Sequence, residues 1–297
     1  MKILVTGKRG QLVQSLVERG ERYKGLTIAT LGRPDIDLLE PETLLPAIEA
    51  AQPDLVVSAA AYTAVDDAEK YPHLAFGINA DGIGALGAAT ATLGIPIIHV
   101  STDYVFSGDK GAPYHEGDPA GPLCAYGLSK YAGELAVAVA NPRSHVLRTS
   151  WAHSPYGKNF IRTMIELAET RPSLRVVADR FGSPTSMLDL ADAILHLATR
   201  PGAPKYGLYH LANRGSTNWA DLARHAFAAS RAVGGPWAEV EGIPASDYPL
   251  PAERPVSSIL LSTRFEETFN WSMPSWQDSA TTVAQRIASE IRASVDA

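Results

Sequence analysis

The sequence is poor in cysteine and has no excess of positive charge, and both features narrow the classes of protein it can encode. Cys124 is the single cysteine among 297 residues, so an internal disulfide cannot form and a thiolate metal cluster is excluded. Lysine and arginine total 26 against 32 aspartates and glutamates, and the net charge of -6 disfavours binding to nucleic acid or to an anionic membrane. We therefore expect a protein of the reducing cytoplasm whose partners are small molecules.

The sequence also lacks a long apolar run. The segment Met1–Gly7 is apolar for only a few residues, which is too short for a signal peptide or a spanning helix. No later window of about 18 residues is free of charged or strongly polar side chains. With 45% hydrophobic and 20% charged residues, the chain can still bury a substantial core. These features predict one large or two modest folded domains and no membrane association.

Short apolar segments alternate with helical patterns in the first half of the chain. Strands are predicted at Lys2–Thr6, Leu26–Leu31, Asp54–Ser58, Pro96–Ser101 and His145–Thr149. Helices are predicted between them, at Gln11–Arg19, Glu42–Ala51, Pro72–Leu93 and Tyr126–Ala140. Strands that alternate with helices build a parallel sheet covered on both faces, so we expect a doubly wound α/β (Rossmann) domain over residues 1–150.

The second half, residues 151–297, has a looser pattern. Proline and glycine clusters separate helical segments near Asp189–Thr199, Asn218–Arg231 and Ser279–Ser294. This pattern predicts a smaller, loop-rich C-terminal α/β lobe that binds substrate. Some of its segments are expected to return to the first domain.

A glycine-containing turn joins the first predicted strand to the first helix. Gly7 and Gly10 of this turn allow the backbone to approach a pyrophosphate, and the helix N-terminus that begins at Gln11 and Leu12 offers unpaired N–H donors. A tight turn without a ligand would show the same short motif, and Val13 stands where a third glycine is usual. Because this turn directly follows the first strand of a βαβ pattern, a dinucleotide site is favoured.

Residues after the second and third predicted strands bear on the choice of cofactor. Arg33 occupies a place where an acidic residue would bind the ribose of NAD, and its guanidinium suits the 2′-phosphate of NADPH. An ordinary solvated arginine is the alternative, which keeps NADH open. Asp37 and Leu38 are expected to border the adenine. The small-residue segment that includes Ala61, Tyr62 and Thr63 would pass beside the cofactor, unless it only reflects close helix packing.

Two further motifs indicate a reacting centre. Tyr126 and Lys130 are four residues apart, which places them on one face of a helix. A nearby ammonium stabilises a phenolate and lowers its pKa from about 10, so Tyr126 can act as a general acid. Such pairs also arise by chance. Thr102, however, ends the fourth strand at the sheet edge where open α/β sheets bind ligands, and its hydroxyl can bond a carbonyl oxygen beside Tyr126.

These motifs, in this order and spacing, resemble those of dTDP-4-dehydrorhamnose reductases in the extended short-chain dehydrogenase/reductase superfamily. The resemblance rests on GxxGQL from Gly7, STDYVF from Ser101, YGxSK from Tyr126 and RTSW from Arg148. It continues through segments 59–66, 179–185, 207–211 and 251–255, and so runs along almost the whole chain.

The resemblance implies that the C4 ketone of dTDP-4-dehydro-β-L-rhamnose is reduced to dTDP-β-L-rhamnose, the last step of dTDP-L-rhamnose biosynthesis. The hydride would come from NADPH or NADH. Tyr126 would donate the proton, Lys130 would lower the pKa of Tyr126 and hold the nicotinamide ribose, and Thr102 would orient the sugar oxygen. The resemblance also assigns Gly10, Gln11 and Leu12 to the pyrophosphate, Asp37 and Leu38 to the adenine side, and Ala61, Tyr62 and Thr63 to the cofactor.

Substrate contacts are implied for four residues. Thr102 and Asp103 match the pair that meets the sugar, and Trp151 matches an aromatic side chain that packs on it. Glu253 stands where a second arginine is common in the family, which leaves Arg254 as the partner for the nucleotide diphosphate. A surface arginine in a proline-rich loop is the alternative for Arg254.

The sequence departs from the family in several places. Segment 152–155 differs from the usual run after the tryptophan, which leaves the identity of the sugar more open than the reaction type. Some family members form dimers through a magnesium ion held by glutamates. Ser15 and Leu188 occupy the matching positions here, so we expect a monomer or a homodimer without a bridging metal.

Other polar residues near these motifs have simpler interpretations. His99 and His153 have no evident carboxylate partner, so structural or surface roles are expected. The acidic cluster of Asp66, Asp67 and Glu69 is interpreted as a solvated helix start rather than a metal site.

Three functions from different classes remain possible on this sequence. The first is the dTDP-sugar 4-ketoreductase, or a reductase of another nucleotide sugar. The second is an epimerase or dehydratase of the same superfamily, which would need further acid–base groups near Thr102, where no paired carboxylates occur. The third is a non-catalytic regulatory subunit, and the intact set of Thr102, Tyr126 and Lys130 argues against it.

Overall fold

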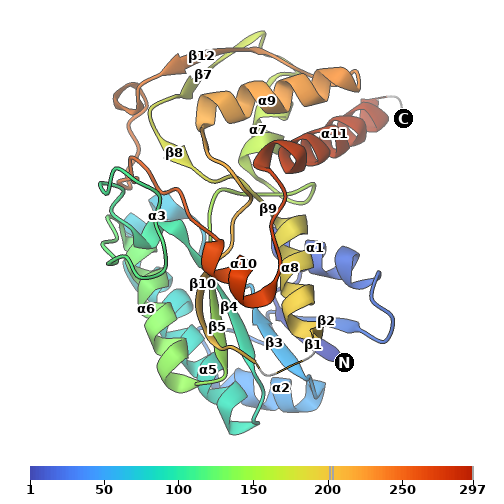
Figure 1. Ribbon diagram of the computed structural model, residues 1–297, viewed down its shortest axis with the longest axis vertical. Helices are drawn as coiled ribbons and strands as arrows, with labels where there is room; N and C mark the ends of the chain where they lie inside the picture. Colours follow the sequence, from blue (N-terminus) through green and yellow to red (C-terminus); the bar gives the residue numbers. More distant parts are fainter. Residues whose placement is uncertain (201, 203, 296–297) are drawn as a thin grey trace.

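A computed structural model describes residues 1–200, 202 and 204–295, and its centre is a parallel sheet of six strands. The strand order is β10-β5-β4-β3-β1-β2, and every neighbouring pair is parallel (Figure 1). The strands are β1 (Lys2–Thr6), β2 (Thr27–Leu31), β3 (Leu55–Ser58), β4 (Ile97–Thr102), β5 (Ser144–Thr149) and β10 (Gly207–His210). The doubly wound α/β fold is thereby confirmed.

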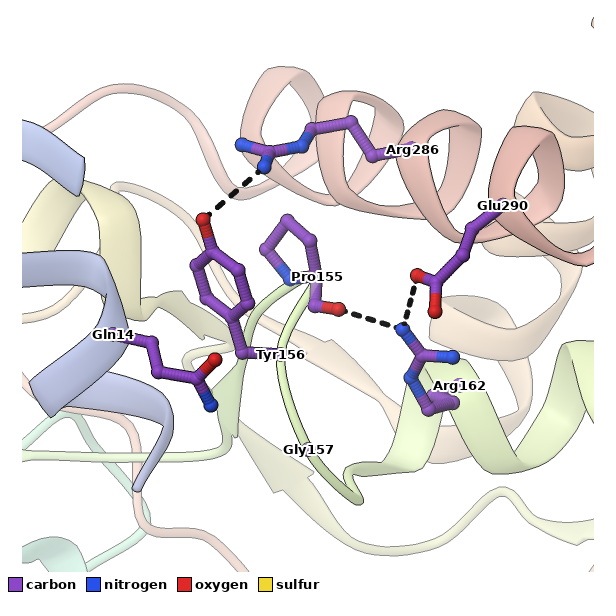
Figure 2. Close-up of a pocket in the computed structure, with 7 residues that line it drawn as sticks. All are labelled: Gln14, Pro155, Tyr156, Gly157, Arg162, Arg286 and Glu290. Carbon is purple, nitrogen blue, oxygen red and sulfur yellow. Dashed lines mark hydrogen bonds and ion pairs between the residues drawn. The ribbon is translucent and has the colours of Figure 1, made fainter. Parts of the chain in front are cut away.

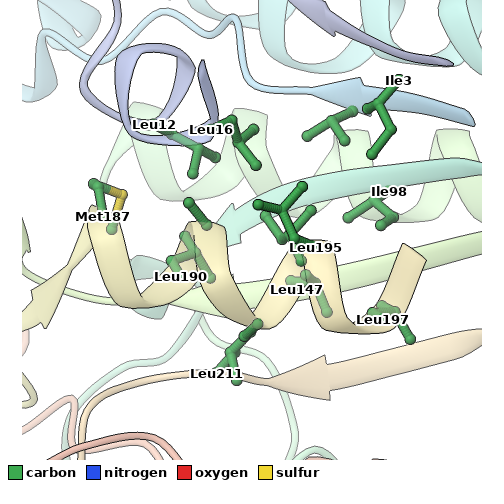
Figure 3. Close-up of a cluster of buried hydrophobic side chains, with 14 of the residues drawn as sticks. Ile3, Leu12, Leu16, Ile98, Leu147, Met187, Leu190, Leu195, Leu197 and Leu211 are labelled. Carbon is green, nitrogen blue, oxygen red and sulfur yellow. The ribbon is translucent and has the colours of Figure 1, made fainter. Parts of the chain in front are cut away.

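Alternating side chains of the buried strands fill two separate cores, one on each face of the sheet. Ile3 and Val5 of β1 face one core, whereas Leu4 between them faces the other. Figure 3 shows the first core, where α1 (Gln11–Gly20) and α8 (Met187–Thr199) cover the sheet. The second core is covered by α2 (Leu44–Ala51), α5 (Gly82–Thr92) and α6 (Ala125–Ala140). Near-continuous apolar strands are what a sheet buried on both faces requires.

Two predicted helices are divided in the structure. The helix predicted at Glu42–Ala51 begins as a 3-10 turn, Pro41–Thr43, before α2. The helix predicted at Pro72–Leu93 consists of α4 (Pro72–Phe76), a π-helical turn (Gly77–Asp81) and α5, and it is preceded by a short helix, α3 (Val65–Lys70). The π-helical turn carries Asn79, whose buried side chain bonds groups outside its own helix. Such turns are frequent at functional sites.

A second lobe is formed by the C-terminal half. Its helices are α7 (Phe160–Leu167), α9 (Trp219–Ala232) and α11 (Trp276–Val295), which share a core that includes Ile161, Leu222 and Val283. The parallel pair β7 (Ser173–Val177) and β12 (Glu239–Ile243) packs beside α9 (Figure 1). Shorter pairs are β6 (Ala152–His153) with β9 (Thr185–Ser186) and β8 (Phe181–Gly182) with β11 (Thr217–Asn218).

The chain passes more than once between the two parts of the molecule. Strand β10 pairs with β5 at one edge of the large sheet, and α8 packs on α1. Helix α10 (Thr263–Phe269) adds Phe265 and Phe269 to the core of the first face. The remaining short elements are the 3-10 turns Asp103–Val105 and Ala245–Asp247. Among the described residues, no helix is both long and apolar enough to cross a bilayer.

Candidate active site

The turn between β1 and α1 has the geometry of a phosphate-binding loop. Gly7 has φ +106, a conformation that disfavours any side chain, and a Cβ on it would lie 3.3 Å from a methyl group of Val13. Val13, which stands where a third glycine is usual, therefore packs against Gly7. Gly10 is exposed and precedes α1 without a side-chain cap, and no acidic residue lies in the first turn of this helix. The free N–H groups and the dipole of α1 fit a dinucleotide pyrophosphate.

The residues predicted around the far end of the cofactor follow β2. Arg33 is exposed, and the Nζ atom of Lys8 in the glycine turn lies 3.0 Å from a carboxylate oxygen of Asp35. Asp37 is half-buried, and its carboxylate accepts a hydrogen bond from the backbone of Leu39. Leu38 is buried in the second core, so its backbone rather than its side chain remains to border an adenine.

Asn79 of the π-helical turn holds the segment after β3 in place. Its Oδ1 accepts a hydrogen bond from the backbone N–H of Tyr62 at 2.8 Å, and its Nδ2 donates to the Tyr62 carbonyl at 3.0 Å. The same Nδ2 donates to Ser129 on α6. The segment with Ala61 and Thr63 is thus fixed against the helix that carries Tyr126. Asn79 was not identified from the sequence, since its partners are distant along the chain.

Thr102 and Tyr126 come together at the carboxyl end of β4. The Tyr126 phenol lies near enough to the Thr102 hydroxyl for that hydroxyl to lower its pKa, and the Tyr126 ring packs edge-on against Tyr104 with ring centroids 5.7 Å apart. Burial raises the pKa of Tyr126 well above its usual value, and the Thr102 hydroxyl offsets only part of this effect. The phenol is therefore protonated at neutral pH and can act as a proton donor.

Lys130 is buried on the same helix as Tyr126 and bonds the neighbouring strand β4. Its ammonium donates to the Val100 carbonyl at 2.7 Å and contacts the Nε2 atom of His99 at 3.3 Å. The expectation that Lys130 lowers the pKa of Tyr126 stays a prediction. Burial lowers the pKa of Lys130 to about 8, while the charge of Glu134 opposes that change.

A buried ion pair supports the helix of Tyr126 one turn beyond Lys130. Glu134 accepts hydrogen bonds from the Arg148 guanidinium of β5 at 2.8 and 2.6 Å. The Ser101 hydroxyl of β4 donates to the same carboxylate at 2.5 Å. Such fully buried, bidentate pairs are costly to break because one charge would be left unpaired. Helix α6 is thus tied to two strands of the sheet.

Asp103 is buried beside Thr102 and is tied to the C-terminal part of the chain. Its carboxylate accepts a hydrogen bond from Ser258 at 2.5 Å and one from Thr102 at 3.2 Å. Burial raises its pKa to about 7, and these hydrogen bonds limit the rise. Both residues predicted to meet the sugar, Thr102 and Asp103, therefore lie together at the edge of the sheet.

Trp151 lies at the start of the second lobe in a constrained conformation. Its φ is 44, and its indole stacks on Trp219 with ring centroids 3.5 Å apart. A Cβ on Gly182 would collide with the indole, so the glycine is needed there. His153 of the same segment is buried, and its Nδ1 lies 3.2 Å from the Trp151 carbonyl oxygen.

Arg254 is paired with a residue that was interpreted as a solvated helix start. Its guanidinium donates to both carboxylate oxygens of Asp66 at 3.1 and 2.9 Å, and the Ala252 N–H also donates to Asp66. Glu69 of the same helix accepts from the backbone N–H of Ala125, the first residue of α6. The interpretation of these acids as merely solvated is wrong for Asp66 and Glu69. Both hold other segments around the site.

A separate pocket of about 650 Å³ has none of Thr102, Tyr126 and Lys130 among its lining residues (Figure 2). It is lined by residues of α1, the loop before α7, α7 itself and α11: Gln14, Pro155, Tyr156, Gly157, Arg162, Arg286 and Glu290. Its two arginines are already paired, Arg162 with Glu290 and Arg286 with Glu18. The described residues contain no group of three His, Cys, Asp or Glu side chains arranged to hold a metal ion.

A parallel α/β sheet, an uncapped glycine turn after β1 and a Thr–Tyr–Lys set beside β4 define an enzyme of the extended short-chain dehydrogenase/reductase class. Residues 1–289 match the family model described as RmlD substrate binding domain. A dTDP-4-dehydrorhamnose reductase of Sinorhizobium fredii is 45% identical over 283 residues, which are 94% of this chain and 95% of the relative. The chain belongs to the dTDP-4-dehydrorhamnose reductase family.

Solved structures agree with this assignment. The reductase from Clostridium acetobutylicum superposes with a TM-score of 0.89 and 34% identity, covering 95% of this chain and 98% of the other. The reductase from Bacillus anthracis, solved in complex with NADP, gives 0.88 and 33% with the same coverage of both chains.

Proposed function

We propose that this protein reduces the C4 ketone of dTDP-4-dehydro-β-L-rhamnose to dTDP-β-L-rhamnose with NADPH. The observation that carries the proposal is the contact between Thr102 and Tyr126 at the carboxyl end of β4, with Lys130 on the same helix. Membership of the reductase family supports the choice of substrate. The glycine turn and the uncapped start of α1 supply a place for the cofactor pyrophosphate.

The protein contributes a proton donor, an orienting hydroxyl and a fixed charge. When bound, the reduced nicotinamide supplies the hydride. Tyr126 is protonated at neutral pH and gives its proton to the sugar oxygen that Thr102 orients. Lys130, with a pKa of about 8, is mainly charged at pH 7, and its ammonium stabilises the phenolate left on Tyr126.

The remaining site residues would bind the ends of the two ligands. Arg33 is exposed after β2 and would pair with the 2′-phosphate of NADPH, with NADH as the weaker alternative. Arg254 would meet the nucleotide diphosphate, held ready by Asp66. Trp151, stacked on Trp219, would offer a flat surface to the sugar, and Asp103 would bond it beside Thr102.

The two halves of the chain would divide this work. Residues 1–150 would bind the cofactor, and residues 151–297 would mainly bind the substrate while returning β10 and α8 to the first domain. We expect a cytoplasmic enzyme that acts as a monomer or as a homodimer without a bridging metal.

A coupled assay tests the proposed function. dTDP-4-dehydro-L-rhamnose is generated in place from dTDP-4-dehydro-6-deoxyglucose by an epimerase, and oxidation of NADPH or NADH is followed by loss of the reduced-nicotinamide absorbance. Oxidation that depends on the epimerase, and is faster with NADPH, is the expected result. Tight NADPH binding without oxidation would contradict it and would point to another nucleotide sugar or to a regulatory subunit.

A further inference from the structure

A histidine that the proposed chemistry does not use lies against the active-site lysine. His99 sits in the middle of β4 and is fully buried. Its Nδ1 lies 3.2 Å from the Ser58 hydroxyl of β3, and its Nε2 lies 3.3 Å from Nζ of Lys130. Both neighbours are buried too, with Ser58 1% and Lys130 2% exposed, so water cannot replace either contact. The three side chains form one line from β3 through β4 to α6.

The chemistry of these groups leaves one arrangement of protons at neutral pH. An ammonium has three N–H donors and no acceptor, so Nε2 of His99 must be the unprotonated nitrogen that accepts from Lys130. The ring proton is then on Nδ1 and is donated to the Ser58 oxygen. Burial and the charge of Lys130 hold the pKa of His99 well below its ordinary value, which keeps the ring neutral. His99 is therefore an acceptor and not an acid or a base.

We infer that His99 is a positioning residue for Lys130: Ser58 fixes the ring in its Nδ1–H form, and Nε2 together with the Val100 carbonyl holds the ammonium against β4. The inference rests on the proposed function for the importance of Lys130. The contacts themselves stand on the geometry alone. Two acceptors on the ammonium favour its charged form in a place where burial opposes charge.

Other charged and titratable groups around Lys130 come from four elements. Helix α6 contributes Tyr126 and Glu134, β4 contributes His99, and the 3-10 turn that follows β4 contributes Asp103. Strand β5 contributes Arg148, whose charge is directed to Glu134 by two hydrogen bonds. Glu134 is therefore largely compensated by Arg148, which leaves the His99 acceptor as a direct support for the ammonium.

The first test needs neither cofactor nor substrate. Nitrogen-15 NMR of the histidine side chains of the free protein at neutral pH should show His99 as the neutral Nδ1–H tautomer. His99→Gln, which loses the resonance, serves to assign it. A ring protonated on Nε2, or on both nitrogens, would overturn the inference because Lys130 would then have no acceptor there.

The second test measures Lys130 in three variants by carbon-13 NMR of Cε-labelled lysine, with Lys130→Arg used for assignment. His99→Phe keeps a ring but removes the acceptor, so the pKa of Lys130 should fall by about one unit. His99→Gln restores an acceptor near the place of Nε2 and should keep this pKa within about 0.3 units of the native value. Ser58→Ala removes the group that fixes the ring tautomer of His99, so it should lower the pKa of Lys130 less than His99→Phe does. Equal shifts in the Phe and Gln variants, or none, would overturn the inference.

The same variants are then compared in the reductase assay. Above neutral pH, the decline of activity should begin about one pH unit lower in His99→Phe than in the native enzyme, and His99→Gln should restore the native profile. An unchanged profile in His99→Phe would count against the inference. If the native protein oxidises no cofactor at all, the proposed function fails, while the two NMR results still decide the role of His99.

Discussion

At the scale of single residues, the site depends on buried polar groups whose partners decide their protonation. Tyr126 lies beside Thr102, Lys130 contacts His99, and Asp103 bonds Ser258. In each case burial disfavours the charged form, and a neighbouring polar or charged group offsets part of that effect. The proton that Tyr126 is proposed to donate is thus retained until the substrate oxygen carries developing charge.

Tyr126→Phe removes this proton donor and little else. The variant should lose at least about a thousandfold in kcat, because the ketone oxygen would develop charge without a proton source. Its affinity for NADPH should be nearly unchanged, measured by fluorescence titration. Turnover close to that of the native enzyme would refute the role of Tyr126 as proton donor.

Asp103→Asn should change how stability depends on pH. The pKa of Asp103 is about 7 in the folded protein and near 3.8 when unfolded, so the folded state favours the protonated acid. Its contribution is complete below about pH 4 and is lost as the pH rises through 7. An asparagine cannot ionise, so the stability of the variant relative to the native protein should rise by roughly 3 kcal/mol between pH 5 and pH 8.

Urea unfolding at both pH values measures this difference. Asp67→Asn, an exposed acid on α3, is the matched control and should leave the pH dependence as it is in the native protein. If the change in stability between pH 5 and pH 8, relative to the native protein, were no larger for Asp103→Asn than for the control, Asp103 would already be ionised in the folded protein at pH 5.

The placement of the proposed reacting residues could be predicted from the sequence because their spacing is local or falls at a strand end. Tyr126 and Lys130 share a helix face, and Thr102 ends a strand. His99, Asn79 and the pairing of Asp66 with Arg254 could not be predicted in this way, since each depends on contact between segments far apart in the chain. The orientation of Lys130 likewise depends on β4, which a helical spacing does not describe.

At the scale of elements, helix α6 is held at short range by the π-helical turn and by α3. Gly133 lies where any Cβ would collide with the Asn79 carbonyl oxygen. The close approach lets Asn79 reach Ser129 of α6 and the Tyr62 backbone at once. The π-helical turn therefore links the segment after β3, which is expected to pass beside the cofactor, to α6, the helix that carries Tyr126.

Gly133→Ala should destabilise the protein by about 2 kcal/mol or more, because backbone must move to admit one methyl group. Gly84→Ala, at the contact of α5 with α6, is the control. A Cβ there would lie 3.2 Å from Ala136 Cβ, so the two helices need to move apart by only a few tenths of an ångström, and alanine favours the helix by about 1 kcal/mol. Urea midpoints should fall clearly for Gly133→Ala alone. Equal midpoints for both variants would contradict the close packing.

Segment 251–255 is expected to contribute to binding of the nucleotide sugar through the Arg254 guanidinium. Arg254→Ala is expected to raise KM for the nucleotide sugar by about tenfold to a hundredfold with a smaller effect on kcat, since the diphosphate is bound equally before and during reaction. Arg175→Ala, which removes an exposed ion-paired arginine, is the control. An unchanged KM in Arg254→Ala would mean that Arg254 serves only as the structural partner of Asp66.

The predicted strands and helices agree best with the structure where the apolar pattern of the sequence decides the structure. The ends of the five predicted strands differ from the observed ones by at most one residue. The π-helical turn was not predicted, because Gly77–Asp81 continues a helical pattern and its irregularity arises from packing against α6. The acidic residues of α3 look solvated in sequence and gain partners only in the folded chain.

At the scale of the whole molecule, the fold brings two parts of the chain around the carboxyl ends of the strands. Helix α8 and β10 complete the first domain from the C-terminal half, and Ser258 and Arg254 return to bond Asp103 and Asp66. Direct hydrogen bonds thereby join the first half of the chain to the C-terminal segment that would meet the substrate. The looser pattern of residues 151–297 predicted a second lobe but not these contacts.

Isotope transfer tests the central claim most directly. The protein is supplied with NADPH deuterated at the transferable position of nicotinamide C4 and with dTDP-4-dehydro-L-rhamnose, and the sugar product is examined by NMR. Deuterium at C4 of dTDP-L-rhamnose, with no product from Tyr126→Phe, is the predicted result. Deuterium at another carbon, or a product without deuterium, would contradict the proposed reduction.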